Sequence, residues 1–144
     1  MTPLLAPPPS SPAARNVMRG NRGRDTRPEL AIRRELHRRG MRYRVHQLVV
    51  EGLRFRPDVV FPRARVAVEI MGCLWHRCPQ CSIADPRTNR EYWRAKLDRN
   101  VERDRRNAAA LEDAGWALIV VWEHEDPADA ADRVQATVRA LSLS

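Results

Sequence analysis

The chain has 144 residues, of which 26 are basic and 18 acidic, so its net charge is +8 at pH 7. This length suits one folded domain. The basic excess favours a polyanionic partner, because cationic side chains that contact phosphates release condensed counterions. An anionic membrane surface would fit the charge equally well, but no apolar run approaches the roughly 18 residues that a spanning helix needs. The N-terminal residues also lack the basic start and apolar block of a signal peptide, which predicts a cytoplasmic protein.

The first helix is predicted after a flexible lead-in. Residues 1–20 are rich in proline and alanine, which is typical of an unfolded segment, and the folded domain is expected to span 21–144. Thr26 and Glu29 have the spacing of a capping box. Gly40 is expected to end the helix.

The rest of the chain alternates strand-like and helix-like stretches. Three strand candidates come first, and the last two are joined by a short turn, so they should form an antiparallel hairpin. A cysteine-rich loop, a long helix, a fourth strand and a closing amphipathic helix follow. This order predicts an α/β fold with a mixed sheet flanked by helices. The expected elements are strands 41–45, 53–61 and 65–71, loop 72–88, helix 89–114, strand 116–122 and helix 127–141.

The three cysteines of the chain lie within nine residues and have the spacing of a metal site. Cys73, Cys78 and Cys81 form a C-x4-C-x2-C pattern. A tetrahedral structural zinc site needs four ligands, so three thiolates need one partner. His76 lies inside the loop, and His124 follows the fourth strand. We favour His124, which reaches the cysteines if strand 116–122 lies beside the strand that ends at residue 71.

Reduced, metal-free thiols are the alternative interpretation of the cysteine cluster. The two remaining histidines, His37 and His46, are expected to be surface or packing residues. A zinc ion with four protein ligands would be structural, because it leaves no open position for water. A catalytic metal must therefore be held elsewhere in the chain.

A pair of acids on the hairpin is typical of a hard-cation site. Asp58 follows Pro57 on the second strand, and Glu69 lies on the third. This resembles the PD-(D/E)xK nuclease pattern, in which two acids bind Mg²⁺ and a lysine two residues later supports the nucleophile. The lysine position is Met71, and the only lysine of the chain is Lys96, so the match is incomplete.

A more specific resemblance covers residues 16 to about 125. Five segments are similar, in order and spacing, to the very short patch repair endonucleases, which implies a restriction-endonuclease-like fold, Mg²⁺ and double-stranded DNA as substrate. The segments are NVMRGNRGRDTRPELAIRRELHRRGMRYRVH, FRPDVVFP, VAVEIMGCLWHRC, TNREYWRAKLDRNVERDRR and GWALIVVWEHE.

The resemblance also implies roles for individual residues. Asp58 is expected to bind Mg²⁺ and His76 to act as the general base for water, since imidazole exchanges protons near neutral pH. Asp104 is expected to support His76 or a metal-bound water, and Glu29 to be an N-terminal acid associated with the site. Without the resemblance, we would expect Asp104 to be a solvated helix residue and Glu29 to be a helix-capping residue. The resemblance assigns Cys73, Cys78, Cys81 and His124 to structural zinc.

The family nicks the thymine strand of a thymine–guanine (T:G) mismatch and wedges side chains into the base stack. Unstacking costs least at a mismatch, which gives selectivity. Leu74, Trp75 and Trp93 occupy the wedge positions, and Trp93 fits a core position equally well. Leu74 replaces the family's usual phenylalanine, and Met71 replaces a polar residue. Glu69 stands where an apolar residue is usual and is expected to supply the missing acid.

We expect a monomer associated with the nucleoid, with mismatch-repair proteins as possible partners. Two alternatives remain: a related nuclease with another DNA target, in a restriction or phage-defence setting, and a non-catalytic zinc-stabilised DNA-binding module. Asp58, His76 and Asp104 together argue against the binding module, because binding alone does not need an acid–histidine set.

Overall fold

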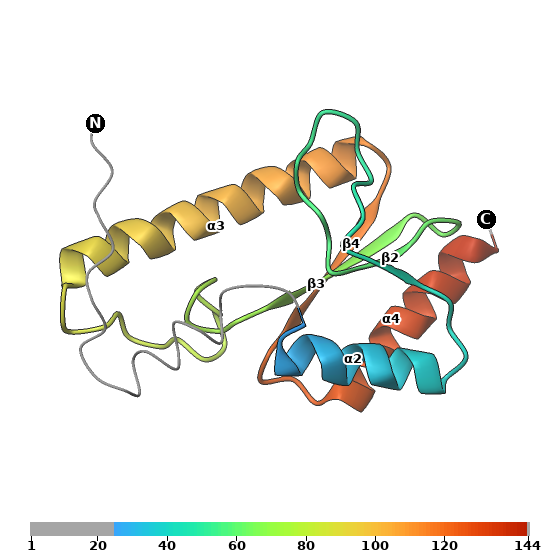
Figure 1. Ribbon diagram of the computed structural model, residues 1–144, viewed down its shortest axis with the longest axis horizontal. Helices are drawn as coiled ribbons and strands as arrows, with labels where there is room; N and C mark the ends of the chain where they lie inside the picture. The colour runs from blue at the N-terminus through green and yellow to red at the C-terminus, as the bar shows by residue number, and fades with distance from the viewer. Residues whose placement is uncertain (1–24, 144) are drawn as a thin grey trace.

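The computed structural model describes residues 25–143, which form a four-stranded mixed sheet with helices on both faces (Figure 1). The predicted flexible segment, 1–20, lies outside the described residues. The elements are α2 (Arg27–Arg38), β1 (Arg44–Val45), β2 (Val59–Phe61), β3 (Val66–Met71), α3 (Arg90–Asp113), β4 (Ala117–Trp122) and α4 (Pro127–Ser142).

The sheet has the order β1-β2-β3-β4. The β2–β3 hairpin is antiparallel as predicted, with Val59 opposite Val68. β4 runs parallel to β3, and Met71 lies opposite Trp122 at the ends of the two strands. The mixed sheet expected from the element order is therefore confirmed. No helix within residues 25–143 is long and apolar enough to cross a membrane.

Each face of the sheet has its own apolar core. On one face, Ile32 and Leu36 of α2 and Val134 of α4 pack against the sheet. On the other face, Leu111 of α3 packs against Val60 and Ala67. Because side chains alternate along a strand, Asp58 and Glu69, the neighbours of Val59 and Val68, point to the α3 face.

Two strands are shorter than the sequence predicts. β1 lacks residues 41–43, because the Met41 amide donates to the Leu36 carbonyl at the end of α2 and so terminates the helix. β2 lacks 53–58, since Pro57 has no amide hydrogen to donate to a neighbouring strand. The segment before β2 is consequently irregular, and it lines the pocket described below.

Thr26 and Glu29 do not form the hydrogen bonds of the predicted capping box. Thr26 is the N-cap of α2, but its side chain makes no capping hydrogen bond. Glu29 instead accepts a hydrogen bond from the Asp25 amide, 2.7 Å from its Oε2. The helix start is thus at the predicted residue, while Glu29 turns inward and is 2% exposed.

We predict that Leu36→Ala lowers the free energy of unfolding by about 2–5 kcal/mol, because Leu36 is fully buried between α2 and the sheet. Urea denaturation followed by circular dichroism measures the change. Leu48→Ala is the matched control, since Leu48 is 51% exposed, and it should change stability by less than about 0.5 kcal/mol. An equal loss in both variants would contradict this packing.

Candidate active site

Asp58 and Glu69 form a carboxyl pair across the β2–β3 hairpin. Asp58 directly precedes Val59, and Glu69 directly follows Val68, the partner of Val59, so the two acids lie at the same end of the hairpin. The Ile70 amide donates to Asp58 Oδ2 at 2.8 Å. Burial, followed by the hydrogen bond and charge of Asp58, raises the pKa of Glu69 to about 11. Glu69 therefore holds a proton at neutral pH, and a divalent cation is the natural replacement for that proton.

His76 and Asp104 form a second pair at the edge of the same site. His76 Nδ1 lies 2.5 Å from Asp104 Oδ2, and each side chain is about one-fifth exposed (22% and 19%). When Nδ1–H donates to Asp104, Nε2 is left as the acceptor. The Asp104 charge also stabilises the imidazolium that forms once Nε2 takes a proton. This is the geometry of an oriented general base.

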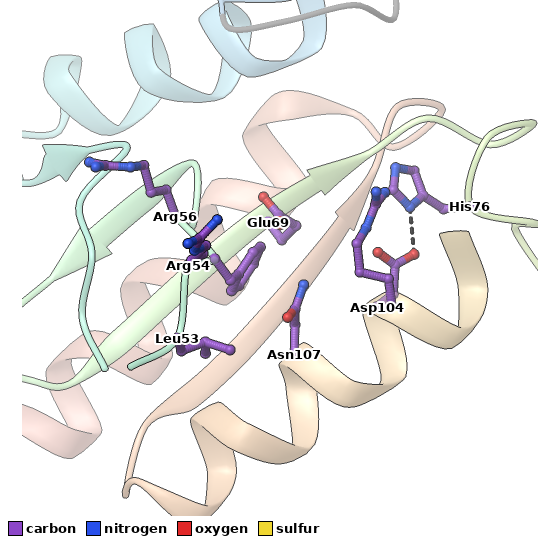
Figure 2. Close-up of a pocket in the computed structure, with 9 residues that line it drawn as sticks. Leu53, Arg54, Arg56, Glu69, His76, Asp104 and Asn107 are labelled. Atoms are coloured by element: carbon purple, nitrogen blue, oxygen red, sulfur yellow. Dashed lines mark hydrogen bonds and ion pairs between the residues drawn. The ribbon is translucent and has the colours of Figure 1, made fainter. Parts of the chain in front are cut away.

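Glu69, His76 and Asp104 line one pocket of about 440 Å³ together with arginines (Figure 2). Asp58, the partner of Glu69, is not among the residues that line it. Glu69 enters it from β3, while His76 and Asp104 lie at one end (Figure 2). A planar guanidinium group can donate two hydrogen bonds to phosphate oxygens. The positive charge of this pocket therefore suits a phosphodiester. The arginines that line it are Arg54, Arg56 and Arg103. The basic excess of the sequence does not by itself single out these three arginines.

Glu29 does not line this pocket. Its Oε1 lies 2.9 Å from Nε2 of His46, and His46 Nδ1 lies 4.0 Å from Asp58 Oδ1. Burial, followed by the negative charge of Asp58, raises the pKa of Glu29. Glu29 is thus beside the site, with His46 between it and Asp58. The sequence predicts only a surface or packing role for His46. The strand pairing indicates where His46 lies. Val45 lies opposite Val59, so His46, the next residue along the chain, lies opposite Asp58.

The predicted wedge residues gather where the cysteine loop meets the start of α3. Trp75 and Trp93 meet edge to face with ring centroids 5.3 Å apart, and Tyr92 meets Trp93 at the same distance. The Lys96 ammonium lies over all three rings, 5.2 Å from the Trp75 centroid. Trp93 belongs to neither of the two core clusters. Leu74 is half-buried in the adjacent turn.

The cysteine loop folds around His124, as the strand pairing predicts. Nδ1 of His124 lies 3.2 Å from Sγ of Cys73, 3.7 Å from that of Cys78 and 3.2 Å from that of Cys81. Ligands of a tetrahedral zinc ion, each about 2.0–2.3 Å from the metal, lie roughly 3.5 Å from one another. His124 Nε2 contacts Gln80 Oε1 at 2.9 Å, which fixes the ring. The cluster is therefore compatible with a zinc site.

The surroundings of Cys73 do not suit a reactive thiol. Burial, followed by a hydrogen bond with Cys81, raises the pKa of Cys73 to about 12. A thiol with such a pKa is not a nucleophile at neutral pH, whereas a bound metal displaces its proton. The Cys73 amide donates to Glu123 Oε1 at 2.9 Å, and this bond also ties the loop to the end of β4.

Comparison with known proteins identifies the family. The sequence model described as DNA mismatch endonuclease Vsr matches residues 10–82. The type II nicking enzyme V.NaeI of Lentzea aerocolonigenes is 43% identical over 137 residues, or 94% of this chain and 82% of that protein. The DNA mismatch endonuclease Vsr of Escherichia coli K12 is 36% identical over 106 residues, or 74% of this chain and 66% of that protein. The chain belongs to the Vsr family.

Vsr-family proteins are DNA endonucleases, so the predictions of the family and of a phosphodiester hydrolase are confirmed. The type II nicking enzyme V.XorIIP of Xanthomonas oryzae is also similar, at 40% identity over 77% of this chain and 79% of that protein. Among solved structures, the catalytic domain of homing endonuclease I-Bth0305I aligns with a TM-score of 0.48 and 20% identity, over 83% of this chain and 96% of that chain. The roles of individual site residues remain predictions.

We predict that His124→Ala protein retains less than one zinc ion per chain and melts at a lower temperature, because the loop loses the ligand that joins it to β4. Elemental analysis and thermal melting with and without a chelator measure both effects. His37→Ala, at an exposed position on α2, is the control and should keep its zinc. Zinc retention by His124→Ala would refute the ligand assignment.

Proposed function

We propose that this Vsr-family endonuclease uses Mg²⁺ to nick the thymine strand of a T:G mismatch. The observation that carries the proposal is the shared pocket, in which the acid of one pair, Glu69, lies with His76 and Asp104 and with arginines. Asp58 and Glu69 are the residues that would hold the cation, since their oxygens are hard ligands. When bound, Mg²⁺ supplies Lewis-acid stabilisation of the charge that develops on the phosphate.

The side chains of the chain supply the remaining chemistry. His76 accepts the proton of the attacking water at Nε2, and Asp104 holds the imidazole orientation through Nδ1. The three pocket arginines hold the phosphodiester and counter its charge. A strand-specific nick requires only one such site, so a monomer is sufficient.

Mismatch selectivity is proposed to come from the aromatic cluster. Trp75, Trp93 and Leu74 would enter the base stack, where a T:G pair is cheaper to unstack than a matched pair. Tyr92 and Lys96 pack on the tryptophans. The product is a nick for repair proteins to process, and we expect the enzyme to act on the nucleoid in the cytoplasm.

Similarity to type II nicking enzymes favours a second candidate, in which the chain nicks DNA within the target sequence of a restriction system. The same chemistry serves both candidates, and they differ in substrate. Varying the sequence around one T:G pair separates them. If the chain is a general repair enzyme, it should nick T:G mismatches in many different flanking sequences. If it serves a restriction system, it should nick the mismatch only within one short sequence.

The test is a nicking assay on labelled duplexes that are matched or contain one T:G pair, with and without Mg²⁺. We expect a Mg²⁺-dependent nick in the thymine strand of the mismatched duplex alone. Asp58→Ala should abolish the nick and keep DNA binding, because it removes a cation ligand and leaves the arginines. Nicking of both duplexes would contradict mismatch specificity, and undiminished nicking by Asp58→Ala would contradict the cation site.

We also predict that His76→Ala lowers the single-turnover nicking rate by about 10²–10⁴-fold, the usual contribution of a general base. The remaining rate should rise with pH, because hydroxide partly replaces the missing base. His37→Ala is the matched control and should nick at the wild-type rate. A rate reduced less than about tenfold, with an unchanged pH profile, would exclude His76 as the base.

A further inference from the structure

Arg77 lies in the chain between His76, the proposed base, and Cys78 of the metal cluster. Its guanidinium contacts two acids at once. Nη1 donates to Asp85 Oδ1 at 2.9 Å, and Nη2 lies 3.1 Å from Asp98 Oδ1. Asp85 lies in the cysteine loop before α3, and Asp98 lies on α3. One side chain therefore joins the turn that carries His76 both to a distant part of its own loop and to the long helix.

The conformation of Arg77 is energetically costly. Its backbone φ is 51°, in the left-handed region that residues other than glycine rarely adopt. Its Nε atom is buried and has no hydrogen-bond partner among residues 25–143. Such features persist where the surrounding contacts determine the conformation, and they are common at functional sites. The two acids thus hold Arg77 in a conformation that it would not adopt alone.

The contact with Asp85 is the better shielded of the two. The Asp85 side chain is 17% exposed, whereas that of Asp98 is 64% exposed, and solvent screens an exposed ion pair more strongly. Arg94 also approaches Asp85, with its Nε 3.7 Å from Oδ2, but Arg94 is exposed and lies on α3 rather than in the loop. Arg77 is therefore the arginine that braces the turn.

His76 depends on the distance between this turn and α3. Its Nδ1 belongs to the loop and its partner, Asp104 Oδ2, belongs to the helix, and the two atoms lie 2.5 Å apart (Figure 2). Both side chains are partly exposed, so packing alone does not fix them. The residue before His76 is also tied to α3, because Asn100 Nδ2 donates to the Trp75 carbonyl at 3.1 Å. The turn is thus held to the helix on both sides of His76.

We propose that Arg77 is a positioning residue, which holds the turn against α3 so that Nε2 of His76 faces the catalytic pocket. This inference rests on the proposed function, in which His76 is the base. Arg77 is not among the residues that line the pocket with His76, and its guanidinium is engaged by two carboxylates. It therefore acts through His76 rather than on the phosphate. Without the guanidinium, the turn would move relative to the helix and the imidazole would lose its single orientation.

The first test measures single-turnover nicking of the T:G duplex at saturating protein. Arg77→Ala should lower this rate about 10–100-fold and leave the dissociation constant for DNA unchanged, since a displacement of about 1 Å costs about 10²-fold. Asp85→Ala removes the brace from the acid side and should lower the rate in the same way. Arg94→Ala is the matched control, because it removes an arginine that approaches the same acid from outside the loop, and should nick at the wild-type rate.

A double variant shows whether Arg77 acts through the base. In a His76→Ala background, Arg77→Ala should change the nicking rate less than about twofold, because a residue that only positions His76 has no effect in its absence. A role for Arg77 elsewhere in the site predicts the same loss of rate in both backgrounds.

The second test reads the orientation of His76 without nicking. In zinc-loaded protein with ¹⁵N-labelled histidine, the ring nitrogen chemical shifts identify the tautomer at a pH where imidazole is neutral, and His76→Gln assigns the signal. We expect a single tautomer, with the proton on Nδ1, in the wild type and in Arg94→Ala. Arg77→Ala should show a mixture of tautomers, because the imidazole no longer donates steadily to Asp104. Elemental analysis confirms the zinc content of each variant.

Four outcomes would overturn the proposal. The first is a single tautomer or the wild-type rate in Arg77→Ala. The second is a rate loss that a higher DNA concentration restores, because Arg77 would then bind the duplex. The third is an equal loss with and without His76. The fourth applies if Arg77→Ala loses its zinc: a zinc-loaded Asp85→Ala variant with the wild-type rate and tautomer would then leave Arg77 a purely structural role.

Failure of the proposed function would look different. His76→Ala would then nick as fast as the wild type, or the wild type would not nick the T:G duplex at all. The tautomer of His76 in Arg77→Ala would still decide whether Arg77 positions the imidazole.

Discussion

The site depends on the register of β3 between its two neighbours. Its antiparallel pairing with β2 sets Val59 opposite Val68 and therefore Asp58 opposite Glu69. Its parallel pairing with β4 ends with Met71 opposite Trp122, so the cysteine loop after β3 meets His124 after β4. A shift of one residue would turn the acids into the apolar core and the valines into the pocket. Burial of valines on both faces of the sheet opposes such a shift.

The cysteine loop after β3 connects the sheet to α3. Its cysteines hold one end against β4, and its His76 contacts Asp104 on the long helix. The same turn carries Leu74 and Trp75 toward Trp93 at the helix start. A structural metal in the loop would therefore position the base and the wedge together, although it takes no part in the chemistry. Loss of zinc should disturb both.

Much of this arrangement follows from local patterns in the sequence. Alternating apolar residues predict the hairpin, Gly40 and Gly115 mark the helix ends, and the cysteine spacing predicts the cluster with His124. The failures concern contacts that depend on neighbours in space. His46 follows a two-residue strand, and only the pairing of that strand reveals that it faces Asp58. Glu29 satisfies the spacing of a capping box, but burial against His46 determines where its carboxylate points.

We propose that the Asp58–Glu69 pair holds a cation that contacts the phosphate being cleaved. The most direct measurement replaces a non-bridging oxygen of the scissile phosphate with sulfur and compares single-turnover nicking in Mg²⁺ and Mn²⁺. Sulfur binds the hard Mg²⁺ ion poorly and the softer Mn²⁺ ion better. We expect slow nicking in Mg²⁺ for one sulfur stereoisomer and recovery in Mn²⁺. Equal slowing of both stereoisomers in both metals would contradict a cation on the phosphate.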